Sequence, residues 1–340
     1  MKAAVARALR DFEVVEARTP GEARTLARER NLDAALIPSD SRSEDAQLSA
    51  KNLAEAAPWL PVLYVSDAPS SENTVRQEAG SRELARELLR ACDGGTHAHR
   101  ERLFAEGLAQ LYVAWQPIVR LSDRSVLGQE ALLRCDHPLL RNPLGFIDLA
   151  LRVGKMDVLG LAVREAIAKS LATTTDPHLA FVNLHVTELA AEDLLRDDGP
   201  LTPFRERIVL EITERASLDD VKDASECAKA LRAKGYRLAI DDLGAGYAGI
   251  SAVAELEPDV CKLDMSVVRN VHLSRPRQRM IKALLQAAND LEMEFVIEGV
   301  ETVEELECLR TLGCDVFQGY LFGRPARERL APSWPPSSPV

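Results

Sequence analysis

The stretch Leu238-Ala239-Ile240-Asp241-Asp242 runs from apolar side chains directly into two carboxylates. A parallel β-strand that is buried on both faces reads as an uninterrupted apolar run, so we expect a strand here with the aspartates at its carboxyl end. Five further apolar runs end in the same way, on a residue that can bind a metal ion or move a proton. Those residues are Asn183, Glu211, Lys262, Glu298 and Gln318.

The spacing of these strand ends predicts the fold. Taken in chain order from Asn183 to Gln318, with Asp241 between Glu211 and Lys262, the strand-end residues are 28, 30, 21, 36 and 20 positions apart. Each step is about the length of one strand and one helix, as in an α/β barrel. Because (β/α)8 barrels carry catalysis at the carboxyl ends of their strands, the pattern predicts a TIM-like barrel with one active site at its mouth.

The start of the barrel has a different connection. We expect its first two strands at 111–116 and 126–130, separated by the polar turn 122–125. A connection this short suits an antiparallel hairpin better than a crossover, so the first strand should run against the others. The second strand ends on Glu130.

Length and composition limit the classes of protein. The 340 residues allow one large domain and one small one. The net charge of −11 argues against a DNA-binding surface, which needs a basic stripe. No apolar run approaches the ~20 residues of a membrane span. The first seven residues lack a secretory hydrophobic core, so we expect a cytoplasmic protein. The six cysteines contain no Cys-x-x-Cys pair, which favours free thiols.

Composition also suggests domain boundaries. Residues 1–92 are expected to form a small α/β domain with strands at 12–16, 34–37 and 62–66, a helix opened by Thr19-Pro20-Gly21-Glu22, and a charged helix at 81–92. A linker is expected at 93–104, with a helix beginning near His99. The barrel should occupy 105–328, and the Pro- and Ser-rich end, 329–340, should be a disordered tail.

The polar residues at the strand ends indicate metal-dependent phosphoryl chemistry. Several carboxylates in one barrel mouth must either take up protons or be neutralised by cations. Ligation by oxygen atoms alone suits Mg²⁺ or Mn²⁺. The adjacent Asp241 and Asp242 could serve two ions ~3.5–4 Å apart, which suits in-line displacement at phosphorus. Lys262 could orient the attacking water or bind phosphate, and Glu298 could act as general base.

Each residue taken singly has a purely structural interpretation. Asp241-Asp242 could be a turn with a helix cap, Asn183 could cap a helix, and Lys262 could form a surface ion pair. The occurrence of one polar residue per strand end over six units is what favours a site. The acidic residues of 301–307 should mostly form the exposed face of a helix, with only Glu301 as a site candidate.

These motifs resemble the EAL domains that hydrolyse cyclic di-GMP. The namesake stands here as Glu130-Ala131-Leu132. The motifs that match in order are 116–119, 130–134 with 137–138, 182–184, 211–214, 241–247, 262–264, 298–302 and 318–322. The resemblance covers about residues 105–328 and implies a metal-dependent phosphodiesterase that opens cyclic di-GMP to linear pGpG. The alternative is a non-catalytic cyclic di-GMP receptor or interaction protein.

The resemblance also assigns roles to residues. It implies metal ligation by Glu130, Asn183, Glu211, Asp241 and Asp242. It implies that Lys262 lies near the nucleophilic water, that Glu298 is the general base and that Glu301 supports the catalytic site. The residues it places on the substrate side are Arg134, Gln116, Gln318 and Tyr320. Glu214 would brace the loop that begins at Asp241, through which family members also form dimers.

Metal choice and oligomeric state follow from the same comparison. Two Mg²⁺ or Mn²⁺ ions are expected, and Ca²⁺ should inhibit because it favours more ligands at longer distances. A homodimer is expected through the Asp241 loop, the N-terminal domain or both. That domain resembles a response-regulator receiver that has lost its chemistry, because Ile37 is followed by Pro38 where a phospho-acceptor Asp would end a strand.

Overall fold

The structure is a computed structural model of the whole chain that describes residues 17, 19–29, 35–38, 48–53, 60, 62–66, 74–76, 95–213, 223–244 and 249–335. The chain divides into two compact units. One contains Met1–Leu111 and Arg134–Leu159, and the other contains Tyr112–Leu133 and Gly160–Val340. The expected strand at 12–16 and the expected helix at 81–92 lie outside the described residues.

The first unit contains a small parallel sheet. Its strands are β1 (Ala35–Pro38), β2 (Val62–Ser66) and β3 (Thr74–Arg76), in the order β1-β2-β3. Helix α2 (Pro20–Glu29) begins as predicted, because the Thr19 hydroxyl accepts a hydrogen bond of 3.1 Å from the amide of Glu22. Pro38 is the last residue of β1. The receiver likeness itself stays a prediction.

The predicted linker at 93–104 is helical from Gly95, four residues before the helix start that we expected near His99. Helix α5 (Gly95–Ala109) already begins at Gly95, and its Phe104 packs edge-on against Phe146 of α6 (Pro143–Arg152) with ring centroids 5.8 Å apart. Both rings are buried. The two glycines near residue 95 suggested a linker, but the buried aromatic pair holds the helix that follows.

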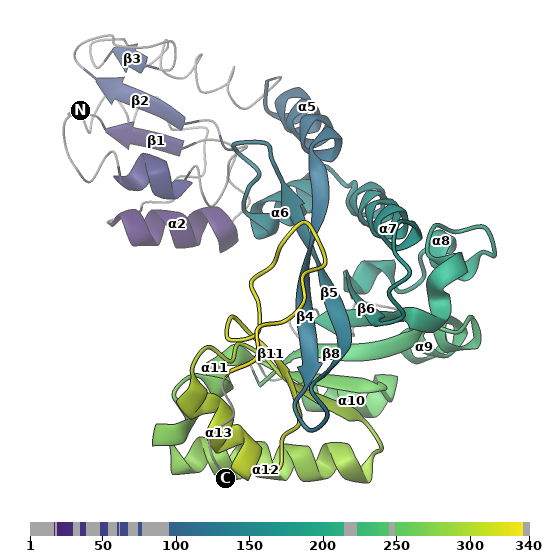
Figure 1. Ribbon diagram of the computed structural model, residues 1–340. Helices are drawn as coiled ribbons and strands as arrows, with labels where there is room; N and C mark the ends of the chain where they lie inside the picture. The colour runs from purple at the N-terminus through teal and green to yellow at the C-terminus, as the bar shows by residue number, and fades with distance from the viewer. Residues whose placement is uncertain are drawn as a thin grey trace. The chain divides into compact units, whose positions relative to one another are not determined.

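The second unit is a closed barrel of eight strands, in the order β10-β11-β4-β5-β6-β7-β8-β9. Figure 1 labels several of these strands, among them β4 and β5. The strands are β4 (Leu111–Arg120), β5 (Ser125–Cys135), β6 (Leu179–Leu184), β7 (Ile208–Thr213), β8 (Arg237–Leu243), β9 (Val260–Leu263), β10 (Glu294–Ile297) and β11 (Val316–Gln318). Pairing is parallel from β5 round to β11, whereas β4 pairs with β11 in antiparallel register. The predicted TIM-like barrel with an antiparallel first strand is confirmed.

Helices surround the barrel and a layer of apolar side chains fills it. The connecting elements are α7 (Met156–Ala172), η1 (Val186–Glu188), α8 (Glu192–Leu195), η2 (Thr202–Arg207), α9 (Ala224–Ala233), α10 (Gly249–Leu256), α11 (Met265–Val268), η4 (Val271–Leu273), α12 (Arg275–Asp290) and α13 (Val303–Thr311). Seven strands contribute one buried residue each to an inner cluster: Ile118, Phe181, Val209, Ala239, Val260, Val296 and Val316. The barrel is therefore a packed core whose chemistry must lie at its ends.

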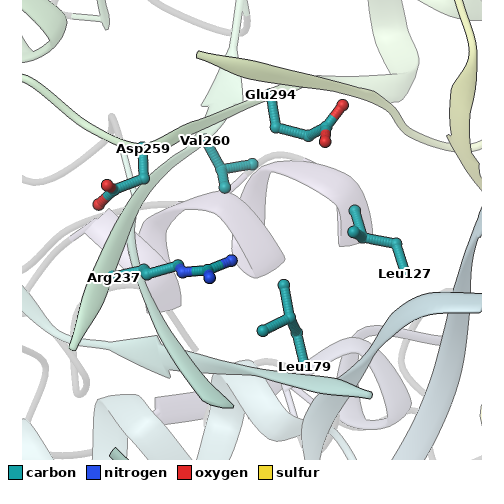
Figure 2. Close-up of a pocket in the computed structure, with 6 residues that line it drawn as sticks. All are labelled: Leu127, Leu179, Arg237, Asp259, Val260 and Glu294. Atoms are coloured by element: carbon teal, nitrogen blue, oxygen red, sulfur yellow. The ribbon is translucent and has the colours of Figure 1, made fainter. Parts of the chain in front are cut away.

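A cavity of about 150 Å³ lies at the amino-terminal end of the strands (Figure 2). Its lining consists of Leu127, Leu179, Arg237, Asp259, Val260 and Glu294. The polar residues singled out from the sequence stand at the opposite ends of these strands, so this cavity is separate from the predicted mouth.

The end of the barrel unit corrects a second prediction. We expected disorder from residue 329, yet residues up to 335 pack on the barrel. The Arg329 guanidinium stacks 4.1 Å from the centroid of the Trp115 ring and pairs with Asp176 at 3.1 Å. Trp334 meets the Phe322 ring edge-on, with centroids 6.2 Å apart. The contacts of Arg329 and Trp334 thus hold this segment on the barrel although its composition is rich in Pro and Ser.

Two expectations from composition can be compared with the described part of the chain. All five cysteines in it are free, as predicted: Cys135, Cys227, Cys261, Cys308 and Cys314. Among the described residues, no helix combines the length and apolar character needed to cross a bilayer.

Candidate active site

The barrel brings the polar strand ends together at its carboxyl mouth. Asn183 of β6 lies directly opposite Glu211 of β7, and Thr213 of β7 lies opposite Asp241 of β8. The amide nitrogen of Asn183 donates to Glu130 Oε1 at 2.9 Å and to Glu211 Oε2 at 3.3 Å. Four neighbouring strands therefore supply one connected group of oxygen ligands.

Lys262 stands at the centre of this group. Its Nζ atom lies 2.5 Å from Glu298, 2.6 Å from Glu211, 3.2 Å from Asp241 and 3.6 Å from Glu130. The Lys262 side chain is fully buried, which excludes the surface ion pair considered above. One buried cation thus faces four carboxylates, and the cluster keeps an excess of negative charge.

The electrostatics reflect this imbalance. Burial works against a charged Lys262, but the surrounding carboxylates outweigh it and hold the lysine pKa well above its usual value. Burial raises the pKa of Glu211 and of Glu298 well above the ordinary range, only partly opposed by Lys262. Burial also acts on Glu130, yet Lys262, Gln318 and Asn183 together lower its pKa. The carboxylates are therefore not equivalent.

Two buried glutamines hold Glu130 from behind. Gln318 Nε2 donates to Glu130 Oε2 at 2.6 Å and to Gln116 Oε1 at 3.2 Å. Gln116 in turn donates to the carbonyl of Gly323 at 3.0 Å. This amide chain holds Oε2 of Glu130, while Oε1 accepts from Asn183. Of the two glutamines predicted on the substrate side, Gln318 contacts the carboxylate of Glu130 and Gln116 contacts Gln318.

Asp242 reaches the site through an unusual backbone conformation. Its φ angle is 59°, in the left-handed region that non-glycine residues rarely adopt. One oxygen each from Asp241, Asp242 and Glu298 lie within 4.8 Å of one another. Strain of this kind is typical of functional positions and persists when neighbouring contacts hold it. The two consecutive aspartates can therefore face the same site although successive strand residues normally point to opposite sides.

The residues fit divalent cations. Two groups of carboxylates have ligand atoms within 4.8 Å of one another, Glu130 with Glu211 and Asp241, and Asp241 with Asp242 and Glu298. Glu211 Oε1 and Asp241 Oδ1 are buried and lack a hydrogen-bond partner, although both lie near Lys262. Buried carboxylate oxygens in this state are suited to a hard metal ion. Asp241 belongs to both groups and could bridge two ions.

Glu301 and Tyr320 each pair with an arginine, and Glu214 lies outside the described part. Glu301 forms a two-bond ion pair with Arg269, at 2.6 and 2.7 Å, and its side chain is about one-third exposed. Tyr320 is exposed and stacks under Arg324, 4.1 Å from the guanidinium to the ring centroid. Arg134 belongs to the first unit, and Glu214 and residues 245–248 are not among the described residues. Their roles stay predictions.

Glu305 was missed and corrects the view of the acidic run. We expected 301–307 to be an exposed face apart from Glu301, yet Glu305 is only 1% exposed. It forms a capping box with Thr302, in which each side chain accepts from the other residue's amide. The sequence signal was present, since a Thr followed three residues later by a Glu is the signature of this cap.

Comparison with known proteins agrees with this geometry. Residues 100–325 match the EAL domain family. The chain is 32% identical over 95% of its length to an uncharacterized signaling protein of Caulobacter vibrioides, of which it covers 39%. It is 34% identical over 64% of its length to the cyclic di-GMP phosphodiesterase NbdA of Pseudomonas aeruginosa, of which it covers 29%. The chain thus spans less than two-fifths of either relative.

A solved structure shares the fold. Klebsiella pneumoniae BlrP1, in its calcium and cyclic di-GMP complex, matches 76% of this chain and 68% of its own at 26% identity with a TM-score of 0.56. The sequence match covers both β4, which runs antiparallel, and the seven parallel strands whose ends carry the carboxylates. The chain belongs to the EAL domain family.

Proposed function

We propose that this chain hydrolyses cyclic di-GMP to linear pGpG with the help of two divalent cations. The observation that carries the proposal is the ring of four carboxylates around the buried Lys262 at the mouth of an EAL barrel. The name of NbdA and the ligand of BlrP1 support this choice of substrate.

Charge explains why cations are needed. Cyclic di-GMP carries two phosphodiester charges, and the carboxylate cluster is itself negative. Bound at the two acidic groups, Mg²⁺ or Mn²⁺ would stabilise the charge that develops on the phosphate oxygens during in-line displacement. The residues that would hold the ions are Glu130, Asn183, Glu211, Asp241 and Asp242. Asn183 offers its carbonyl oxygen, since its nitrogen already donates to Glu130 and Glu211.

Glu298 is placed to move the proton. In the reaction a water oxygen bonds to phosphorus and its proton passes to Glu298. The bond to one ribose 3′ oxygen breaks, and that oxygen takes a proton from solvent to become the free 3′ hydroxyl of pGpG. The raised pKa of Glu298 suits a group that must accept a proton near neutral pH. Lys262 holds Glu298 at 2.5 Å and stays protonated because its own pKa is raised, so it orients the base.

One assay tests the proposal. The purified full chain is incubated with cyclic di-GMP and Mn²⁺, with and without excess chelator, and pGpG is followed by chromatography. We expect turnover with Mn²⁺ and loss of turnover with chelator. If the chain binds cyclic di-GMP without hydrolysing it, the protein is a cyclic di-GMP receptor and not an enzyme. If it does not bind cyclic di-GMP, a protein-interaction function is favoured.

The proposal includes the assembly. We infer a homodimer that forms through the loop after Asp241, through the N-terminal domain or through both. The loop starts directly after two candidate metal ligands, so packing against it can couple assembly to metal occupancy. Light scattering of the full chain with and without Mn²⁺ tests this, and a monomer under both conditions rejects it.

A further inference from the structure

We propose that Glu305 is a positioning residue that locks together the loop after β9, the strand that carries Lys262, and the loop that begins at Glu298 after β10. The inference rests on the proposed function for its catalytic consequence, but not for its structural content. One loop follows β9 and runs through α11 to η4, and the other follows β10 and leads to α13. Glu305 lies at the start of α13, where both loops meet.

The carboxylate of Glu305 accepts hydrogen bonds from both loops. Its Oε1 accepts from the amide of Asn270 at 2.9 Å. Its Oε2 accepts from the amides of Glu301 at 3.1 Å and Thr302 at 3.3 Å. Each oxygen therefore serves a different loop, and the residue is almost completely buried. A charged acceptor that is shielded from water makes stronger bonds than a neutral one.

The inner side of the same junction is closely packed. The amide of Glu298 donates to the carbonyl of Leu263 at 3.1 Å, so the base follows directly from the strand next to Lys262. Gly299 has a φ of 66°, and a Cβ atom built there would lie 2.3 Å from Cβ of Met265. Any shift of one loop must therefore move the other.

The outer side is closed by a solvent-facing ion pair. Arg269 precedes Asn270 and holds Glu301 with two hydrogen bonds. Arg269 and Glu301 thus join the same two loops as Glu305, one layer farther out. Glu301, predicted to support catalysis, is paired with Arg269 at the outer side of this junction. The geometry gives it this positioning role beside Glu305.

Hydrogen exchange and kinetics together test the assignment. A glutamine at 305 carries one acceptor oxygen and one NH₂ group, so Glu305→Gln must lose the bond to one loop. We expect amide exchange in 264–273 or in 298–303 to accelerate roughly tenfold to hundredfold. Kinetics are measured well below the melting temperature of the variant. We expect kcat to fall at least about tenfold and KM to stay within about twofold of wild type, because the base is misplaced while substrate contacts remain.

Two further variants separate reach from charge. Glu304→Gln removes the same charge from the first turn of α13, but Glu304 is exposed and should behave as wild type in both assays. Glu305→Asp keeps the charge but is too short to reach both loops, so it should resemble Glu305→Gln. Wild-type behaviour of Glu305→Asp would show that only the charge at the helix start matters, and would overturn the proposal.

The exchange measurement stands without activity. If the wild-type chain does not hydrolyse cyclic di-GMP, the proposed function fails, whereas the exchange of the two loops still decides the role of Glu305. In the wild-type chain the amides of Asn270, Glu301 and Thr302 should be protected together. Rapid exchange of these amides in the wild-type chain would overturn the inference, and this measurement does not depend on how well a variant folds. Unchanged exchange in both loops of Glu305→Gln would also overturn it.

Discussion

Nζ of Lys262 lies 2.5 Å from Oε1 of Glu298 at the mouth of the barrel, where the Lys262 side chain is fully buried and that of Glu298 is partly buried. The contact joins the end of β9 to the residue after β10, and it lets a lysine whose pKa the carboxylates raise orient a carboxylate whose pKa burial raises. A base held in this way needs little reorganisation when substrate arrives.

Glu298→Gln should abolish most turnover while cyclic di-GMP still binds. An amide keeps the shape of the side chain but cannot accept the proton of the attacking water. Loss of a general base typically lowers the rate ~10²–10⁴-fold. Turnover and equilibrium binding are measured on the same preparation, with the exposed Glu304→Gln as the charge-matched control. Near-normal turnover would remove Glu298 from the mechanism.

Asp241→Asn should weaken metal binding more than Asn183→Ala does. Asp241 belongs to both acidic groups and supplies a formal charge, whereas Asn183 supplies a neutral oxygen. Since charge count tunes the affinity of oxygen-ligand sites over decades, we expect a difference of roughly tenfold or more in the Mn²⁺ dissociation constant. Calorimetric titration measures both. Equal losses would show that Asp241 does not bridge two ions.

Ca²⁺ should inhibit in competition with Mg²⁺ or Mn²⁺. It prefers 6–8 oxygen ligands at 2.3–2.6 Å, so it can occupy the carboxylates with a geometry unsuited to in-line displacement. Turnover at fixed Mn²⁺ is measured against increasing Ca²⁺, and excess Mn²⁺ should restore it. Activity with Ca²⁺ alone at the Mn²⁺ rate would contradict this explanation.

The barrel and the meeting of its polar strand ends could be predicted because their signal is local. Each buried strand gives an apolar run, and the run ends on a polar residue, as at Ile240 before Asp241. What the sequence could not show was which polar residues turn inward. Lys262 could have been a surface lysine, and only the closed barrel places four carboxylates around it.

The errors arose where tertiary contacts override composition. Glu305 sits in a run of acidic residues typical of an exposed helix face, yet it is buried because two loops direct their amides at it. Gly95 suggested a linker, but Phe104 anchors the helix that begins there. In each case the residue is held by a partner whose position cannot be predicted from the sequence: the loop amides that bond Glu305 and the Phe146 ring that packs on Phe104.

The C-terminal segment should contribute measurably to stability. Trp334→Ala removes the edge-on contact with Phe322, and Arg329→Met removes both the stacking on Trp115 and the bond to Asp176. We expect each to lower the free energy of unfolding by about 1–3 kcal/mol in urea titrations. Leu330→Ala, between them and 53% exposed, is the control and should stay within about 0.5 kcal/mol. If both variants are as stable as wild type, the contacts of this segment do not contribute to the stability of the barrel.

The metal-free chain should become less stable as the pH rises above 4.5, the ordinary pKa of a glutamate. Glu211 and Glu298 have folded-state pKa values well above that value, so in the window between the two values the folded chain binds more protons than the unfolded chain. The free energy of unfolding therefore falls with rising pH. Glu130, whose pKa is lowered, changes the pH dependence of the free energy of unfolding only below pH 4.5. The raised pKa of Lys262 contributes an amount of stability that does not vary with pH below 10.5.

Urea midpoints measured in chelator between about pH 5 and pH 8 should show this fall. Because metal ligands must be deprotonated, saturating Mg²⁺ or Mn²⁺ should stabilise the chain more at the upper end of the range and flatten the profile. Glu211→Gln removes one of the two titrating groups and should reduce the slope in chelator, while the exposed Glu304→Gln should leave it unchanged. A profile in chelator that is flat, or that has the same slope in Glu211→Gln, would show that the cluster around Lys262 is ionised throughout and does not hold its protons in the metal-free chain.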